Sequence, residues 1–188
     1  MGALIAGIIL WSFAHLMPSV LPGPRAVLQT RLGVGPHKGL VALTLALALA
    51  LIIYGWRHMV PEYVYDPPVW GRHLNFLTMF FAIILFGASQ GKSRLRQWVR
   101  HPMLTGVLVW ALGHLAANGD TRSLILFGGM GLWALVSIFT ISAKEGHWVK
   151  PAEVASIGRE LLGILIALVL YGILFASHQW FAGVALVG

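Results

Sequence analysis

The chain has 188 residues, of which 58% are hydrophobic and only 10% are charged, and its mean hydropathy is +0.81. These values exclude an ordinary soluble globular domain, in which about a quarter of the residues are charged. The absence of cysteine also excludes disulfides, thiolate metal sites and iron–sulfur clusters. The composition predicts a single integral membrane domain over residues 1–188.

The charged residues are confined to five short stretches, which separate six uncharged segments. Each segment is long enough for a membrane-crossing helix, which needs about 20 residues. Helix is the expected form because hydrocarbon offers no hydrogen-bond partner to the backbone. We therefore predict an all-α bundle of six transmembrane helices, with spans at about residues 3–20, 39–56, 73–91, 101–118, 123–143 and 161–181.

Basic residues are distributed unequally between the two sides of this predicted bundle. If the six spans alternate in direction, ten of the 13 lysines and arginines fall in the connections after the first, third and fifth spans. The positive-inside rule then places these connections in the cytoplasm and both termini on the non-cytoplasmic side. We expect a multi-pass protein of the bacterial inner membrane. Topology and contact with anionic lipid account for the net charge of +7, without a nucleic-acid partner.

Two connections carry local structural signals. Residues 25–38, RAVLQTRLGVGPHK, are expected to include a short interfacial helix with apolar side chains facing the lipid. Asp120 precedes the fifth span and is expected to cap its helix. All six aspartates and glutamates lie in connections, so the predicted spans contain no carboxylate.

Histidines mark the candidate site, because imidazole can bind haem or a transition metal without bringing charge into the bilayer. Five of the eight histidines fall in the uncharged segments. His73, His101 and His178 lie near the ends of their segments, where they are expected to reach the membrane interface. His15 and His114 lie deeper, which favours a ligand role, with a structural hydrogen bond between helices as the alternative.

Each of these two inner histidines follows a tryptophan by four residues, Trp11 before His15 and Trp110 before His114. Residues four apart share one face of a helix, so each imidazole lies beside an indole. Large aromatic side chains next to an imidazole are typical of the wall of a macrocycle pocket, although they are also common in apolar helices.

Three stretches resemble the NnrU family of membrane proteins, namely FAHLMPSVLPGPRAVLQTRLG, YGWRHMVPEYVYDPPVWGRHLNFLTM and RHPMLTGVLVWALGHLAANGD. The resemblance covers roughly residues 1–143 and is most specific in the last stretch. Members of this family are associated with denitrification, in the handling of nitrite and nitric oxide. A related domain in zeta-carotene isomerase binds haem b between membrane histidines and isomerises a cis double bond.

The resemblance implies one non-covalent haem b with His15 and His114 as its axial ligands. Ala111 stands where the isomerase has a cysteine as a further candidate ligand. The implied activity is a haem-dependent isomerase or oxidoreductase step, acting on an apolar small molecule or a nitrogen oxide, and a homo-oligomer is compatible with it. The alternative is a non-catalytic membrane protein that binds no cofactor and assists assembly or transport.

Depth in the membrane adds two alternate ligands. His15 and His114 lie about four residues from their span midpoints on opposite sides, a difference of ~10 Å at 1.5 Å per residue. His58 and His73 share the outer half with His114 and are therefore the alternates.

Two arginines are candidates to hold the haem propionates. Arg25 and Arg100 flank the inner ends of the spans that contain His15 and His114. A guanidinium can hold a carboxylate with two parallel hydrogen bonds. The alternative is that both arginines only determine the topology.

Overall fold

The computed structural model describes residues 1–186, and every regular element in this range is helical. The principal helices are α1 (Gly2–Val20), α2 (Pro22–Leu32), α3 (Val34–His58), α4 (Gly71–Ser89), α5 (Pro102–Ala117), α7 (Gly129–Glu145) and α8 (Ile157–Ala182). Three short turns join them: a 3₁₀ turn η1 (Arg94–Gln97), the helical turn α6 (Thr121–Ser123) and a π-helical turn η2 (Leu124–Gly128). The all-α expectation is therefore confirmed.

Five segments of the described chain are long and apolar enough to cross a membrane: Gly2–Val20, Val34–His58, Gly71–Ser89, Thr121–Glu145 and Ile157–Ala182. The fourth predicted span corresponds to α5, an apolar helix of 16 residues that is shorter than the others. Many large apolar side chains face outward, and Leu43 is 70% exposed. A surface of this kind is expected for helices surrounded by lipid.

A helix in the first basic connection and the cap at Asp120 are confirmed, and the helices of two predicted spans begin earlier than expected, α3 at Val34 and α8 at Ile157. A short helix, α2, overlaps the first basic connection but begins before it, at Pro22, and the Asp120 side chain accepts a hydrogen bond of 2.9 Å from the Ser123 backbone N–H. The predicted span 39–56 begins earlier, at Val34, because Pro36 is tolerated in the first turn of a helix. Gly33, with a φ of 82°, allows the sharp turn from α2 into α3.

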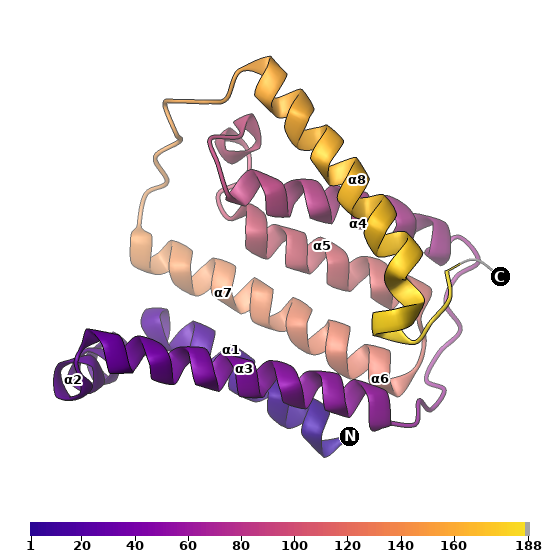
Figure 1. The fold of residues 1–188 in the computed structure, drawn as a ribbon, viewed down its shortest axis with the longest axis horizontal. Coiled ribbons are helices and arrows are strands. Elements are labelled where there is room, and N and C mark those ends of the chain that lie inside the picture. The colour runs from indigo at the N-terminus through magenta and orange to yellow at the C-terminus, as the bar shows by residue number, and fades with distance from the viewer. Residues whose placement is uncertain (187–188) are drawn as a thin grey trace.

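Apart from α2, the principal helices form a row in which each packs against its neighbours in the order α3, α1, α7, α5, α4 and α8. Figure 1 shows α1 and α3 at one edge of this row and α8 at the other. The π-helical turn η2 contacts both α5 and α1. As a result, α7 and η2 separate α1, which carries His15, from α5, which carries His114.

Contacts between connections identify the two ends of the bundle. Leu4 and Met59 share one apolar cluster, and the indole N–H of Trp56 donates to the carbonyl of Ala182 at 3.0 Å. Both described ends of the chain therefore lie at the end where α3 finishes. At the opposite end, the backbone N–H of Ala155 donates to the carbonyl of Lys92 at 2.6 Å. This up-and-down arrangement agrees with the alternating spans that the sequence predicts.

Glycines let α4 and α5 approach closely beside the end that carries both termini. A Cβ atom added to Gly71 would overlap the carbonyl oxygen of Ala116, and one added to Gly113 would lie 2.8 Å from the side-chain oxygen of Asn75. The partner at Gly71 is backbone, which cannot move aside without shifting α5 itself. The close contact between α4 and α5 thus depends on glycine, which has no side chain, at both positions.

We expect Gly71→Ala to destabilise the fold by about 1–3 kcal/mol, because the new methyl group pushes α5 away from α4. Thermal unfolding of the detergent-solubilised protein, followed by circular dichroism, measures the effect. Gly87→Ala is the matched control on the same helix, since no atom lies within 4 Å of its added Cβ. Equal melting temperatures for the two variants would contradict the close packing at Gly71.

Candidate functional site

His114 lies in the last turn of α5, where one nitrogen of its ring is hydrogen-bonded to the backbone and the other has no partner in the described chain. Its Nδ1 lies 2.9 Å from the backbone carbonyl oxygen of Trp110, one turn earlier. A carbonyl only accepts hydrogen bonds, so in the neutral ring Nδ1 carries the proton and Nε2 carries the lone pair. Metal-binding histidines commonly use this arrangement, because the bound nitrogen fixes both tautomer and ring orientation.

Aromatic rings hold the imidazole of His114 in place. Phe127, buried in the π-helical turn η2, stacks on it with ring centroids 4.3 Å apart and an angle of 21° between the planes. The same phenyl ring contacts Trp110 edge-on at 4.8 Å. A π-helical turn inserts an extra residue into a helix and is frequent at functional sites. Here it brings Phe127 against His114.

Two adjoining cavities lie beside His114, with volumes of about 390 Å³ and 250 Å³. Both are lined by Asn75, Phe76, Trp110, His114, His178 and Phe181. These residues come from α4, α5 and α8. Small-molecule and cofactor sites typically occupy concave, largely apolar spaces of about 300–1,000 Å³ with a few polar groups on the wall.

His178 lies on the wall of these cavities, although the sequence analysis assigned it to the membrane interface. It lines both cavities with His114, and its Nδ1 lies 2.8 Å from the carbonyl oxygen of Val184. Its Nε2 therefore carries the lone pair in the neutral ring, as in His114. The expectation of an interfacial side chain rested on its position near the end of α8. The sequence did contain one sign of this position. Alternating spans place His178 in the same half of the bundle as His114, so the two histidines have a similar depth in the membrane.

Two further polar residues reach the cavities. Arg72 lines the larger one and donates a hydrogen bond to the carbonyl of Leu186. Asn75 lines both, is 7% exposed, and its side-chain oxygen is buried without a hydrogen-bond partner in the described chain. A bound molecule could supply that partner, since buried polar atoms are normally paired.

The structure places His15 and Trp11 elsewhere. The His15 Nδ1 lies 3.0 Å from the Trp11 carbonyl, so the local geometry repeats that of Trp110 and His114. The ring, however, packs against Trp133 of α7, with centroids 5.2 Å apart. His15 lines neither cavity beside His114. The structure therefore does not bring the two histidines of the predicted ligand pair together.

Of the alternate ligands, neither lines these cavities. His58 is exposed on α3 and stacks on Tyr54, with ring centroids 4.1 Å apart. His73 is exposed near the start of α4. Both do lie at the same end of the bundle as His114, as the residue count predicted.

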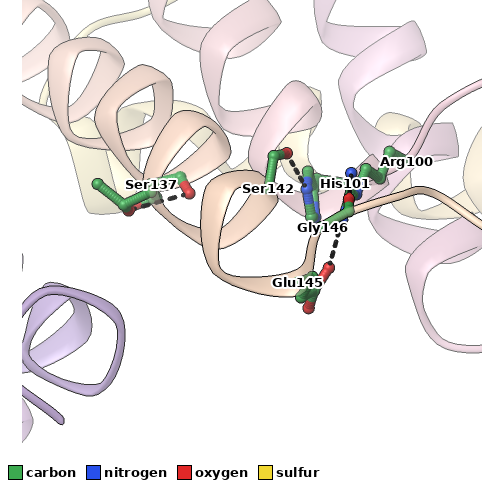
Figure 2. Close-up of polar contacts among 7 residues, drawn as sticks. Arg100, His101, Ser137, Ser142, Glu145 and Gly146 are labelled. Carbon is green, nitrogen blue, oxygen red and sulfur yellow. Dashed lines mark hydrogen bonds and ion pairs between the residues drawn. The ribbon is translucent and has the colours of Figure 1, made fainter.

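The two arginines expected to hold propionates lie far from His114. Arg100 precedes α5 and donates to the carbonyl of Gly146 at 2.9 Å and to the carboxylate of Glu145 at 3.2 Å. Figure 2 shows this cluster, in which the neighbouring His101 contacts the Ser142 hydroxyl at 2.9 Å. Arg25 lines a separate cavity between α1 and α3. Arg72 is the arginine that reaches the cavities beside His114.

A loop segment fixes the end of the helix that carries His114. The Tyr65 hydroxyl donates toward the carbonyls of Leu115 and Asn118, with an oxygen separation of 2.8 Å for Asn118. The carbonyl of Gly119 accepts from the backbone N–H groups of Val64 and Tyr65 at 2.8 Å and 3.1 Å. Helix ends leave carbonyls without partners, and these bonds satisfy them.

The donor set fits haem b. Two imidazoles with available Nε2 atoms share one aromatic-lined space, and Arg72 can bind a carboxylate there. No group of three or more histidine, aspartate or glutamate side chains that could hold a metal ion occurs within residues 1–186. Two protein ligands are enough for haem, because the porphyrin supplies the other four nitrogens.

The family model described as NnrU protein matches residues 3–186, which is nearly the whole chain. This match extends beyond the region of resemblance seen in the sequence and includes α8 with His178. Neither the curated proteins nor the solved structures contain a significant match to the chain.

Replacing Tyr65 by phenylalanine tests the anchoring of α5. Loss of the hydroxyl should lower the free energy of unfolding by about 1 kcal/mol at pH 7. Burial, and secondarily the Asp120 carboxylate, raises the pKa of Tyr65 above its ordinary value. The protonated hydroxyl's contribution is therefore complete below pH ~10 and disappears as the pH rises through the raised pKa.

Denaturation in detergent across this pH range measures both effects, and the gap between wild type and Tyr65→Phe should narrow above pH ~10. Tyr54→Phe is the control, because the exposed Tyr54 hydroxyl makes no hydrogen bond in the described chain. A Tyr65→Phe variant as stable as wild type at pH 7 would show that the Tyr65 hydroxyl does not stabilise the end of α5.

Proposed function

Because the chain belongs to the NnrU family, we propose that it is a membrane protein that binds haem b non-covalently in the cavities beside His114 and acts in nitrogen-oxide metabolism. The observation that supports this most directly is the geometry of His114. Its ring is oriented by the Trp110 carbonyl and by Phe127, and its free nitrogen belongs to a residue on the cavity wall.

His178 is the residue that would hold the haem iron together with His114. It shares both cavities with His114, whereas His15 packs against Trp133 of α7. The His15 and His114 pair implied by the family resemblance stays the rival assignment. The two assignments differ in which helix closes the site, α8 for His178 and α1 for His15.

Arg72 is the residue proposed to hold a propionate, since among the described residues it is the one arginine or lysine on the wall of the larger cavity. Its planar guanidinium can form two parallel hydrogen bonds to a carboxylate. Bound haem would supply an iron centre for electron transfer or for binding nitric oxide. The protein's own contribution is to orient the two imidazoles and to surround them with apolar walls.

The walls of the smaller cavity favour an uncharged reactant. They include Met79, Ile83, Phe86, Leu174 and Phe175, and they contain no charged side chain. A nitrogen oxide such as nitric oxide is small and uncharged, and an apolar molecule suited to isomerisation would also fit this lining. The proposed reaction is accordingly a haem-dependent redox or isomerisation step on an uncharged reactant.

The proposed membrane topology is six crossings in the bacterial inner membrane, with both termini on the non-cytoplasmic side. The ten-to-three division of basic residues supports it, and so do both described ends of the chain lying at one end of the bundle. Reporter fusions at Gly91 and at the C-terminus should report opposite sides of the membrane. Fusions that report the same side would contradict six alternating crossings.

The haem proposal predicts a Soret band for protein purified from haem-replete cells. His114→Ala should lose haem or become high-spin, because the iron lacks a strong nitrogen donor. His178→Ala should behave in the same way, while His15→Ala should keep the wild-type spectrum. Absorption spectra and the haem-to-protein ratio measure these outcomes.

His58→Ala and His73→Ala are the matched controls, since both side chains lie at the same end of the bundle but outside the cavities. A wild-type protein without a Soret band would overturn haem binding and favour the non-catalytic alternative. If His15→Ala loses haem and His178→Ala does not, the pair implied by the resemblance is correct. A wild-type spectrum for His114→Ala would exclude it as a ligand.

A further inference from the structure

A separate cavity of about 260 Å³ lies at the end of the bundle opposite His114, between the last residues of α1 and the first residues of α3. Figure 1 shows α2 covering this end, at the far side of the molecule from both termini. Helix ends in a membrane protein lie at the level of the lipid headgroups. The cavity is therefore placed where the headgroup region meets the hydrocarbon.

Three nitrogen-bearing side chains converge on this cavity: Arg25 from α2 and His37 and Lys38 from the first turn of α3. Within the described chain, neither Arg25 nor Lys38 takes part in an ion pair. A further cation is close to Arg25 and Lys38, because the Lys144 ammonium donates to the carbonyl of Pro18, another lining residue, at 2.6 Å. Within residues 1–186, no ion pair with a carboxylate neutralises the positive charge at this cavity.

His37 supplies an independent sign of a missing ligand. It is only 4% exposed, and its Nε2 atom is buried without a hydrogen-bond partner in the described chain. Leaving a buried polar atom unpaired is costly, so such atoms normally have a partner. The N-terminus of α3, to which His37 belongs, adds the positive end of a helix dipole.

The remaining wall is apolar. Val41, Ala42 and Leu45 continue the cavity along α3 towards the middle of the membrane. An inorganic anion would make no favourable contact with this apolar wall, whereas the acyl chain of a lipid can pack against it. Charge at one end and hydrocarbon at the other match the two parts of a phospholipid.

We infer that this cavity binds the phosphate group of an anionic phospholipid, held by Arg25, His37 and Lys38, with an acyl chain along Val41 and Leu45. This site is distinct from the cavities beside His114 and does not depend on haem binding. It stands on the convergence of cations, the unpaired His37 nitrogen and the apolar wall.

Binding can be measured on the full chain in neutral detergent by native mass spectrometry, with the melting temperature as a second readout. Phosphatidylglycerol should bind and raise the melting temperature more than phosphatidylcholine does. The double variant Arg25→Gln, Lys38→Gln should bind phosphatidylglycerol at least ~10-fold more weakly, because two charged partners of the phosphate are lost.

The double variant Arg31→Gln, Arg159→Gln is the matched control. It removes the same charge from side chains that lie outside the cavity and form no ion pair in the described chain. It should retain phosphatidylglycerol binding. Equal losses in the two double variants would overturn the site in favour of general surface attraction.

Ala42→Phe tests the cavity itself without a change of charge, since the larger side chain would fill it. This variant should also lose phosphatidylglycerol binding while keeping a wild-type circular dichroism spectrum. If it binds the lipid as wild type does, the cavity is not the site.

Inorganic phosphate should not displace the lipid. Displacement together with equal stabilisation by phosphate alone would identify a free anion as the ligand instead.

Discussion

The contact between residues 62–65 and residues 118–121 fixes the arrangement on which the candidate site depends. Gly119 accepts two backbone hydrogen bonds from this loop, and the Thr121 backbone N–H donates to the Glu62 carbonyl at 2.8 Å. The contact ends α5 one turn after His114 and leads the chain into the capped turn before η2. The last carbonyls of a helix have no partner within the helix, and the loop supplies partners for those of α5. Phe127 can stack on His114 only while both segments stay in this register.

Two identical local patterns have different surroundings in this fold. Trp11 and His15 repeat the spacing and the Nδ1 hydrogen bond of Trp110 and His114. The difference comes from the neighbouring helix: Trp133 of α7 packs against His15, whereas cavities lie beside His114. A short sequence motif determines how an imidazole is oriented on its own helix. Packing between helices determines whether its second nitrogen faces a side chain or a cavity.

The helical elements were predictable because charge is excluded from the spans, and the capping role of Asp120 followed from its local sequence. The start of α3 at Val34 and the π-helical turn were not predictable, since both depend on packing that no periodic pattern records. Among the residues that line the cavities, His114 was singled out in the sequence by its depth and by the tryptophan one turn away. The sequence did not place His178 beside His114, because a residue near the end of a span was interpreted as interfacial, although its depth matches that of His114. Arg72 was not considered because the propionate candidates were taken from the inner ends of the spans, and Arg100 at that end lies about 20 Å from His114 along α5.

The cavities at the two ends of the bundle differ in the charge of their walls. No carboxylate occurs within the five apolar spans except at their terminal turns, so the cations at the cavity of Arg25 and Lys38 have no internal counter-ion. An external anion is the remaining way to neutralise them, and lipid phosphate is abundant at that level. At the other end, neutral imidazoles and aromatic rings line the cavities, with Arg72 as their charged group. A cofactor with an apolar ring system and carboxylates at one edge complements that set, whereas a simple phosphate would leave its apolar walls without a partner.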